Sequence, residues 1–388
     1  MLENIRNISG NFINAFSQLV ISIAVSKIFS PDLYGEFVYV MAIAFMISVL
    51  FNFGYNVFGL VFFSKKYHNI LRLLINYSYL SLILIVLVTI LTGYAVVALA
   101  SIYVFLVLLK ELFNISLVID KRISRKIYFN LVDLSLIILV FAYVYFTGVK
   151  SMSLLLLFGI LLLIKLISFA FLPPGKSIST LKPLPLSNSI RYVRVFFRIV
   201  RYNSLNVLFT TVYTQGYFIV IGSLLSFSEV SLVKYLTLIQ SNLNIITTSV
   251  VQLRNNLFNK VSTKLSELRG LFRSLLVVQL AGAAFSVALI YYFSLFSLFF
   301  DYNIKDYFLV IVVMASFTLT PAKQAMGLFL TSKNLFMQRT NAIIISVLLA
   351  VPILLLLHYS LYFIALYFIM IDIVSLYLFI KSVAKWRS

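Results

Sequence analysis

Three lysines lie within or at the ends of long apolar segments: Lys27, Lys234 and Lys323. A charged side chain at membrane depth is costly, so such residues are candidates for function. Lysines in a polar cleft would suit an anionic ligand, because an ammonium group pairs with phosphate or carboxylate oxygens. The alternative for Lys27 and Lys234 is that they lie near the outer ends of their helices and reach water along their aliphatic stems. Lys323 lies deeper in its segment, which favours a binding role.

Amides and hydroxyls accompany these lysines at helical spacing. One stripe ends at Lys27 and consists of Asn7, Asn11, Asn14, Gln18, Ser22 and Ser26. A second stripe consists of Lys234, Thr237, Ser241, Asn244, Thr248 and Gln252, and a third group of Thr320, Lys323, Gln324 and Thr331. Residues three or four apart share one helix face, and unpaired polar groups are costly in hydrocarbon. Each stripe therefore predicts a polar helix face that points toward the interior of the protein.

Acidic residues at the same depth are candidates for ion coupling: Asp372, Asp133 and Glu111. Asp372 lies near the middle of the last apolar segment, with no charged neighbour on its own helix. Such a carboxyl group suits a proton-coupled carrier and equally suits a buried neutral acid. For Asp133 and Glu111, which are expected near Lys110, an ion pair between adjacent helices is the plainer interpretation. Lys165 belongs to the same group of intramembrane charges.

The composition is that of a membrane protein. The 388 residues are 62% hydrophobic and 11% charged, with a mean hydropathy of +1.06, which leaves too little polar surface for a soluble globule. The absence of cysteine and the separation of the two histidines, His68 and His358, argue against a metal site. No GxGxxG, Walker A or HExxH pattern occurs. We therefore expect neither an enzyme nor a cofactor.

Apolar runs of about 20 residues, long enough to cross a bilayer, predict twelve transmembrane helices. Six lie at roughly 10–29, 37–63, 73–92, 95–118, 127–147 and 151–172, and six more at roughly 203–226, 231–253, 274–299, 307–331, 340–357 and 360–380. The expected fold is an all-α polytopic membrane protein. Its expected domains are an N-terminal six-helix bundle at 1–172, a cytoplasmic basic linker at 173–201 and a C-terminal six-helix bundle at 202–388.

Basic residues indicate the orientation of these helices, because Lys and Arg accumulate in cytoplasmic loops. With both termini in the cytoplasm, 24 of the 31 Lys and Arg residues fall in inner segments and only 3 in outer loops. The linker ends in an amphipathic run with Arg191, Arg194, Arg198 and Arg201, which can lie on an anionic inner leaflet. In this membrane context, contact with lipids is favoured over nucleic-acid binding.

The two predicted halves begin with similar hairpins. Placing residues 7–52 over 204–249 without a gap pairs Gln18 with Gln215 and Asp32 with Glu229. Each copy is a polar-striped helix, an acidic break and a second helix. This pattern predicts an internal repeat.

The segment Ser26-Lys27-Ile28-Phe29-Ser30-Pro31-Asp32-Leu33-Tyr34-Gly35-Glu36-Phe37 resembles the polysaccharide biosynthesis, or O-antigen flippase, family. Members typically have a first span that ends in S-x-x-x-S-P-x-x-[FY]-G, and a related acidic turn begins the second half, here Ser228-Glu229-Val230. The six-plus-six division and the basic middle loop extend this resemblance over essentially the whole chain. It implies the MATE-like fold of the multidrug/oligosaccharidyl-lipid/polysaccharide exporters, in which two six-helix bundles surround a central cavity.

The resemblance also implies a function in O-antigen and lipopolysaccharide biosynthesis. Family members move an undecaprenyl-diphosphate-linked oligosaccharide from the cytoplasmic to the outer leaflet of the bacterial inner membrane by alternating access, and a polysaccharide polymerase is an expected partner. Cationic cavity residues bind the diphosphate, which by position would be Lys27, Lys234 and Lys323, although no arginine lies clearly inside a span as it does in some relatives. The groups expected to bind sugar hydroxyls are Asn14, Gln18, Thr211, Gln215 and Asn244.

Two other functions remain open at this point. A cation-coupled drug or metabolite exporter of the same fold predicts a cavity dominated by acids, whereas the deep charges here lean positive. A membrane polysaccharide polymerase or glycosyltransferase needs catalytic acids or arginines on a sizeable loop, and no predicted outer loop exceeds about ten residues.

Overall fold

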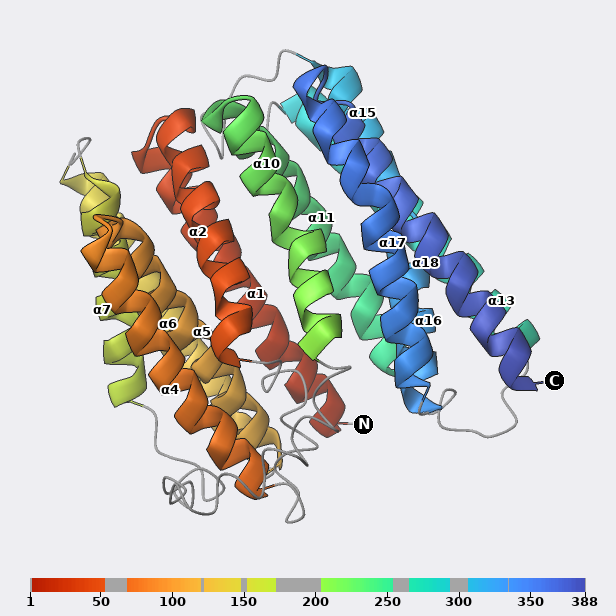
Figure 1. The fold of residues 1–388 in the computed structure, drawn as a ribbon, viewed down its shortest axis with the longest axis horizontal. Coiled ribbons are helices and arrows are strands. Elements are labelled where there is room, and N and C mark those ends of the chain that lie inside the picture. Colours follow the sequence, from red (N-terminus) through yellow and green to blue (C-terminus); the bar gives the residue numbers. More distant parts are fainter. Residues whose placement is uncertain are drawn as a thin grey trace. The chain divides into compact units, whose positions relative to one another are not determined.

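The computed structural model describes residues 2–52, 68–119, 122–147, 152–171, 204–253, 265–293, 306–333 and 335–387, and these residues form helices without any strand among them (Figure 1). They belong to two compact units. Unit 1 comprises Met1–Phe29 and Glu36–Thr211, and unit 2 comprises Ser30–Gly35 and Val212–Ser388. The predicted linker at 173–201 lies outside the described residues, so the predicted domain boundaries stay predictions.

Unit 1 is a bundle in which α1 packs along α6, and α5 packs against both α4 and α7. Its helices are α1 (Leu2–Ile28), α2 (Pro31–Asn52, from Glu36 onward), α4 (His68–Leu91), α5 (Ala95–Ile119), α6 (Ile123–Phe146) and α7 (Leu154–Ala170). Phe129 of α6 is 2% exposed and packs against Leu117, Phe113 and Phe169. This aromatic contact ties α5, α6 and α7 together.

The ends of these helices follow local sequence signals. Gly93 has a φ of +82° and lets the chain turn from α4 into α5 within three residues, with the Tyr94 N–H donating to the Thr89 carbonyl over 2.7 Å. Ser153 begins α7, because its hydroxyl accepts the Leu156 N–H over 3.3 Å. The short gap between the spans predicted at 73–92 and 95–118 is therefore confirmed.

Unit 2 contains one π-helical turn and a second set of long helices. They are η1 (Val212–Gly216, the π-helical turn), α10 (Tyr217–Leu224), α11 (Phe227–Leu253), α13 (Leu265–Phe293), α15 (Tyr307–Ser316), α16 (Thr320–Ser332), α17 (Phe336–Leu355), the short 3₁₀ helix η2 (Leu356–His358) and α18 (Phe363–Arg387). The core of this unit surrounds α16, where Met326, Phe329 and Leu330 pack against α13, α17 and α18.

The break between α15 and α16 has a local cause. Pro321 has no N–H to donate to the carbonyl of Phe317, which accepts the Thr320 N–H instead, over 3.1 Å. The predicted single helix at 307–331 is therefore two helices joined by a turn at 317–319. This turn allows the two helices to present different faces to their neighbours.

The first turn of α11 is held by a capping box. The Ser226 N–H and hydroxyl both donate to Glu229 over 2.9 Å, and the Glu229 N–H donates back to the Ser226 hydroxyl over 3.3 Å. In the first half, the Ser30 hydroxyl accepts the Leu33 N–H over 3.4 Å and caps α2, without the reciprocal bond because Leu33 stands where Glu229 does. The ungapped alignment pairs Ser30 with Phe227. The two capping serines, Ser30 and Ser226, are therefore offset from that alignment by one residue.

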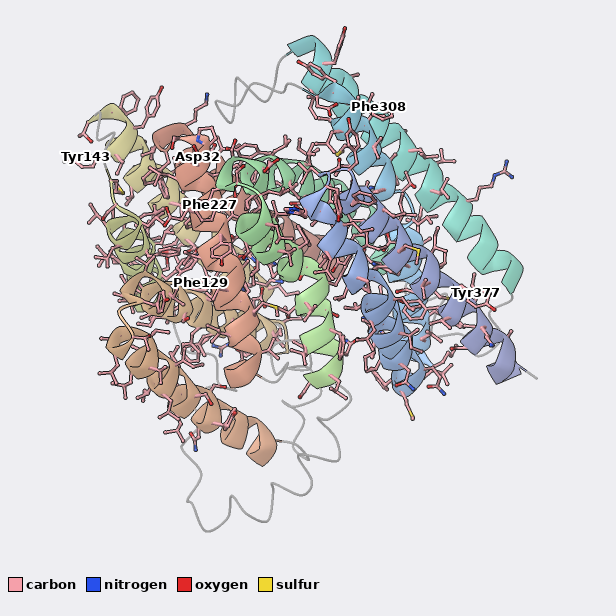
Figure 2. The ribbon with its side chains drawn as sticks, turned by 45° about the horizontal axis from the view of Figure 1, so that its top comes forward. Asp32, Phe129, Tyr143, Phe227, Phe308 and Tyr377 are labelled. Atoms are coloured by element: carbon pink, nitrogen blue, oxygen red, sulfur yellow. The ribbon has the colours of Figure 1, made fainter. Side chains whose placement is uncertain are left out.

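The helices have the lengths and surfaces of a multi-pass membrane protein. Among the described residues, seven helical segments are long and apolar enough to cross a bilayer, and four shorter apolar helices accompany them. Each predicted span overlaps a helix or two consecutive helices, while the count of twelve crossings stays a prediction. Tyr143, Phe308 and Tyr377, labelled in Figure 2, are 70%, 65% and 62% exposed. Such outward aromatic side chains are expected of a lipid-facing surface.

Candidate functional site

A cavity of about 250 Å³ lies within unit 2, among η1, α10, α11, the turn before α16, α16 itself and α18. Its polar wall residues include Gln215, Lys234, Thr237, Gln240 and Gln324. Five aromatic rings also line the wall: Tyr213, Tyr217, Phe218, Phe317 and Phe368. Amide and hydroxyl groups beside aromatic faces are suited to a hydroxyl-rich ligand.

The π-helical turn places two of these residues. Val212–Gly216 is wound more widely than an α-helix, and such turns commonly occur at functional sites. Tyr213 and Gln215 of this turn both line the cavity. The ring of Tyr217, one turn further on, meets Phe368 of α18 edge to face at 5.1 Å between centroids. Residues of η1, α10 and α18 thus meet on this side of the wall.

Lys234 is the cation on this wall. Its ammonium nitrogen lies 5.5 Å from the centroid of the Phe218 ring, a distance at which the ring face attracts a cation. Within the described part of the chain, no carboxylate lies within ion-pair distance of Lys234. The cavity therefore carries a positive charge that an anionic ligand could neutralise.

Lys323 lies beside the same wall and is paired with an acid. Its ammonium group lies 4.3 Å from the centroid of the Tyr213 ring and donates to one carboxylate oxygen of Asp372. The hydroxyl of Thr320 donates to the other oxygen. Asp372 is completely buried, whereas the Lys323 side chain is 13% exposed. The pair balances two charges that would each be costly alone.

Asp372 was expected from the sequence to lack a charged neighbour on its own helix, and its partner indeed comes from another one. Because Lys323 and Asp372 stand on α16 and α18, the ion pair ties these helices together. With Lys234, Lys323 and Asp372 all ionised, this region holds one positive charge in excess.

Unit 1 contains a separate cluster of buried charges around Asp133. One oxygen of Asp133 accepts hydrogen bonds from Lys110 over 2.7 Å and from Lys165 over 2.6 Å. The other accepts from Lys165 over 2.8 Å and from the Ser168 hydroxyl over 3.0 Å. Lys110 also donates to the side-chain oxygen of Asn14 over 3.0 Å. The ion pair expected between adjacent helices is therefore present, and it is a triad that joins α5, α6 and α7 and reaches α1.

The remaining candidates are divided between the units. Lys27 and Gln18 are half-buried on α1 in unit 1, and Asn14 of the same helix serves the Asp133 cluster. The Thr211 hydroxyl donates to its own helix, to the Val207 carbonyl over 2.8 Å. Glu111 is half-buried on α5, close enough to Lys110 to interact electrostatically with it.

In unit 2 the structure brings together Gln215, Lys234 and, beside the wall, Lys323. Asn244 lies on α11, but its side chain is outside the described part of the structure. Sequence reasoning missed Tyr213, Tyr217 and Gln240 as wall residues. With 24 tyrosines in the chain, no pattern singled out these two, and Gln240 falls between the stripe positions Thr237 and Ser241.

Comparison with known proteins identifies the fold. No family model and no curated protein sequence matches the chain. An inward-facing multidrug resistance MATE family transporter of the MOP superfamily superposes with a TM-score of 0.61 at 14% identity, covering 95% of this chain and 92% of that one. A MATE structure in the bent conformation gives 0.53 at 15% identity, covering 97% and 92%. A MOP superfamily transporter from Pyrococcus furiosus, described as having a binding pocket of reverse polarity, gives 0.51 at 15% identity, covering 97% and 92%.

The fold class defined by these likenesses is that of the MATE transporters of the MOP superfamily. The described residues thus form an all-helical fold like that of the MATE structures, with segments long and apolar enough for a multi-pass membrane protein. At 14% and 15% identity the comparisons establish the fold alone. The ligand has to be argued from the cavity.

Proposed function

We propose that this protein is a flippase that moves a polyprenyl-diphosphate-linked oligosaccharide from the cytoplasmic to the outer leaflet by alternating access. The observation that carries the proposal is Lys234, a cation on the wall of a polar and aromatic cavity that no carboxylate in the described part of the chain neutralises. A diphosphate cannot cross hydrocarbon unaided, because each unpaired charge costs several kcal/mol or more. A cavity whose polar and charged groups replace the water around the diphosphate lowers this cost.

The wall offers a partner for each part of the head group. Lys234 would pair with a phosphate oxygen, while Gln215, Thr237 and Gln240 would exchange hydrogen bonds with sugar hydroxyls. Phe368 and Tyr217 present flat apolar faces, against which the C–H faces of sugar rings pack. Lys323 provides a second cation if the phosphate competes with Asp372 for it.

The polarity of the cavity favours this substrate over a cationic drug. A drug exporter of the same fold would need an acid free to pair with its substrate, but here both oxygens of Asp372 accept hydrogen bonds, from Lys323 and Thr320. The likeness to a multidrug transporter concerns the fold alone. The argument about the ligand rests on this chain's own wall residues.

The proposal extends to the cellular setting. On the family resemblance we place the protein in a bacterial plasma membrane, and the distribution of Lys and Arg supports an orientation with both termini in the cytoplasm. The substrate would be a repeat unit of a surface polysaccharide such as O-antigen, which a polysaccharide polymerase would then consume on the outer side. Reporter fusions after Arg125 and after Lys150 would report opposite sides of the membrane in this topology, and the same side in both would refute it.

The test is a flipping assay in reconstituted vesicles. A fluorescent lipid-linked oligosaccharide is placed in both leaflets, and a membrane-impermeant reagent measures how fast the protected fraction becomes accessible. We expect the wild type to flip it and to leave a cationic dye in place. Uptake of the dye without flipping of the oligosaccharide would overturn the proposal in favour of drug export.

A further inference from the structure

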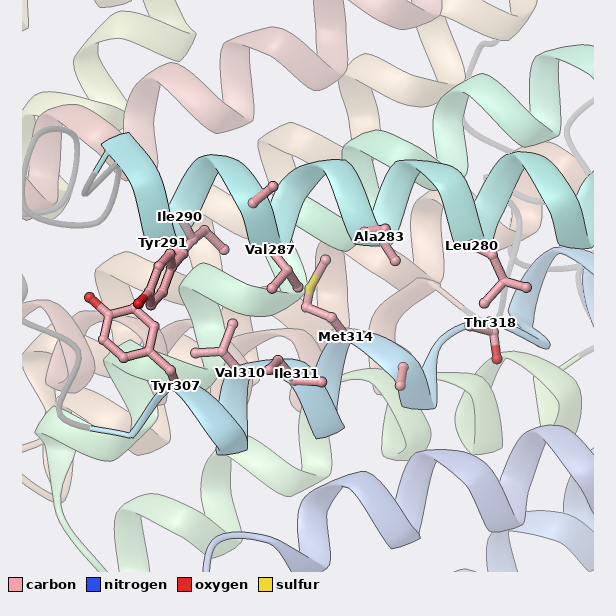
Figure 3. A pocket seen from close by; sticks show the side chains of 13 residues that line it. Leu280, Ala283, Val287, Ile290, Tyr291, Tyr307, Val310, Ile311, Met314 and Thr318 are labelled. Carbon is pink, nitrogen blue, oxygen red and sulfur yellow. The ribbon is translucent and has the colours of Figure 1, made fainter.

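An apolar groove of about 470 Å³ runs along unit 2 between α13 and α15 (Figure 3). Its floor is formed by Ala283, Val310 and Met314, which are at most 6% exposed. Its rims include Leu280, Tyr291 and Ile311, which are 47%, 59% and 47% exposed. The groove is therefore open to the outer surface of the unit along its length.

The dimensions of the groove suit one hydrocarbon chain. From Leu280 to Tyr291 it follows α13 for about 16 Å, roughly half of the 30 Å hydrocarbon core. Alanines at 284, 288 and 315 keep the slot free of bulky side chains. At one end the rings of Tyr291 and Tyr307 meet edge to face, with 5.4 Å between centroids. A single chain could lie there within the depth of one leaflet.

The groove and the cavity share one wall. Met314, Ala315 and Thr318 line the groove, whereas Phe317 and Thr320 of the same segment line the Lys234 cavity. The end of α15, the turn at 317–319 and the start of α16 present different residues to their two sides, so this one stretch of chain separates a cationic polar cavity from an apolar groove. A ligand with an anionic polar head and a long apolar tail matches both spaces in charge and polarity.

We propose that this groove binds the isoprenoid chain of the lipid-linked substrate while its diphosphate and sugars occupy the Lys234 cavity, a proposal that rests on the proposed function. Because surrounding lipid is as apolar as the groove, selectivity comes from packing rather than from the hydrophobic effect. The methyl-branched isoprenoid chain fills the alanine-lined slot in a fixed place, which keeps the head group at the cavity during transfer.

The experiment fills the groove and compares substrates that differ only in tail length. Ala284→Phe and Ala315→Phe place a ring in the slot from exposed positions, and Ala281→Phe is the matched control on an exposed position of α13 outside the groove lining. We expect both groove variants to flip the long-chain substrate about tenfold more slowly, with a short-chain analogue flipped at the wild-type rate. The control should flip both normally.

Cross-linking identifies the occupant. A photoreactive isoprenoid diphosphate should label α13 or α15 in the wild type and lose that labelling in Ala284→Phe, whereas a phospholipid with a photoreactive acyl chain should not label the groove. Unchanged long-chain flipping in the groove variants, an equal loss in the control, or phospholipid labelling in place of isoprenoid labelling would overturn the groove proposal. A wild-type protein that flips neither the long nor the short substrate would instead refute the proposed function.

Discussion

A Cβ atom added to Gly35 would overlap the carbonyl oxygen of Phe227, so the first turns of α2 and α11 meet backbone to backbone. The contact continues on either side of this point. Ser231 donates its hydroxyl to the Pro31 carbonyl, and the rings of Tyr34 and Tyr235 stack at 5.0 Å with 6° between their planes. The short motif that carries the family resemblance therefore has a structural role, because Pro31, Tyr34 and Gly35 dock onto α11.

Gly35→Ala is expected to destabilise the protein by at least about 1–3 kcal/mol, because backbone must move to admit the methyl group. Thermal unfolding of the purified protein in detergent measures this as a lower Tm. Gly159→Ala is the matched control, since a Cβ there meets nothing within 4 Å and alanine favours the interior of α7 by about 1 kcal/mol. Equal Tm values for wild type and Gly35→Ala would show that the close contact is absent in solution.

Sequence reasoning located the helices well, because the length of an apolar run and the residues at its ends are local signals. Gly93 is a position where the sequence-based prediction succeeded, and Pro321 is one where it failed. The tight turn at Gly93 was anticipated, whereas the break that Pro321 introduces at 317–319 was not, since the hydropathy continues across it. An apolar run indicates that a segment lies within the membrane, but it does not indicate whether the helix is continuous along that segment.

The candidate site was harder to predict because its contacts join distant parts of the chain. Lys323 and Asp372 were each identified as intramembrane charges but were assigned to different groups, and only the packing of α16 on α18 brings them together. Asn14 was expected to bind sugar, yet its side chain accepts a hydrogen bond from Lys110. A stripe of polar residues predicts which face of a helix points inward, but it does not predict which residues that face contacts.

Asp133→Asn is expected to destabilise unit 1 by about 3–5 kcal/mol, because it removes the carboxylate that both buried lysines, Lys110 and Lys165, pair with. Limited proteolysis and yield from the membrane would report the loss. Replacing all three residues with apolar ones, Asp133→Leu with Lys110→Met and Lys165→Met, should restore most of the stability. If this triple variant folds but has lost flipping, the cluster serves ion coupling, and its structural interpretation is wrong.

Asp372→Asn is expected to strengthen binding of the anionic head group by about tenfold, or about 1.4 kcal/mol, because Lys323 no longer has a competing carboxylate. Equilibrium binding of a short-chain prenyl diphosphate to the purified protein measures the effect. The Asp372→Asn, Lys323→Ala double variant should lose the gain. Unchanged or weaker binding by a folded Asp372→Asn would mean that Lys323 is not available to the ligand.

Just before the apolar segments Tyr307–Leu330 and Phe363–Ala384, which begin later than the span predicted at 360–380, the hydroxyl of Tyr362 donates to Asp306. Asp306 also caps α15 by accepting the Leu309 N–H over 3.0 Å. The bond from Tyr362 lowers the pKa of Asp306, and the same bond raises the pKa of Tyr362. The hydrogen bond therefore stabilises the fold at pH values between the ordinary pKa values of the two groups, 3.8 for Asp306 and 10.0 for Tyr362. This stabilisation is lost at lower pH as Asp306 is protonated, and at higher pH as Tyr362 is deprotonated.

Tyr362→Phe tests this pH dependence. We expect its Tm to fall slightly below that of the wild type at neutral pH and to converge with it at strongly acidic and strongly alkaline pH. Tyr359→Phe, at an exposed neighbouring position, is the control. A difference in Tm that is the same at every pH would contradict the assignment of the hydrogen bond.

The most direct test of the central claim is the rate at which the Lys234→Ala variant flips a lipid-linked oligosaccharide in vesicles, measured beside Lys234→Arg and beside Lys381→Ala, which removes an exposed lysine of α18. Loss of the wall cation should slow flipping about tenfold or more, equivalent to at least about 1.4 kcal/mol. Arginine should retain most of the rate and Lys381→Ala all of it. Wild-type flipping by a correctly inserted Lys234→Ala protein would contradict the claim that this cavity carries the diphosphate.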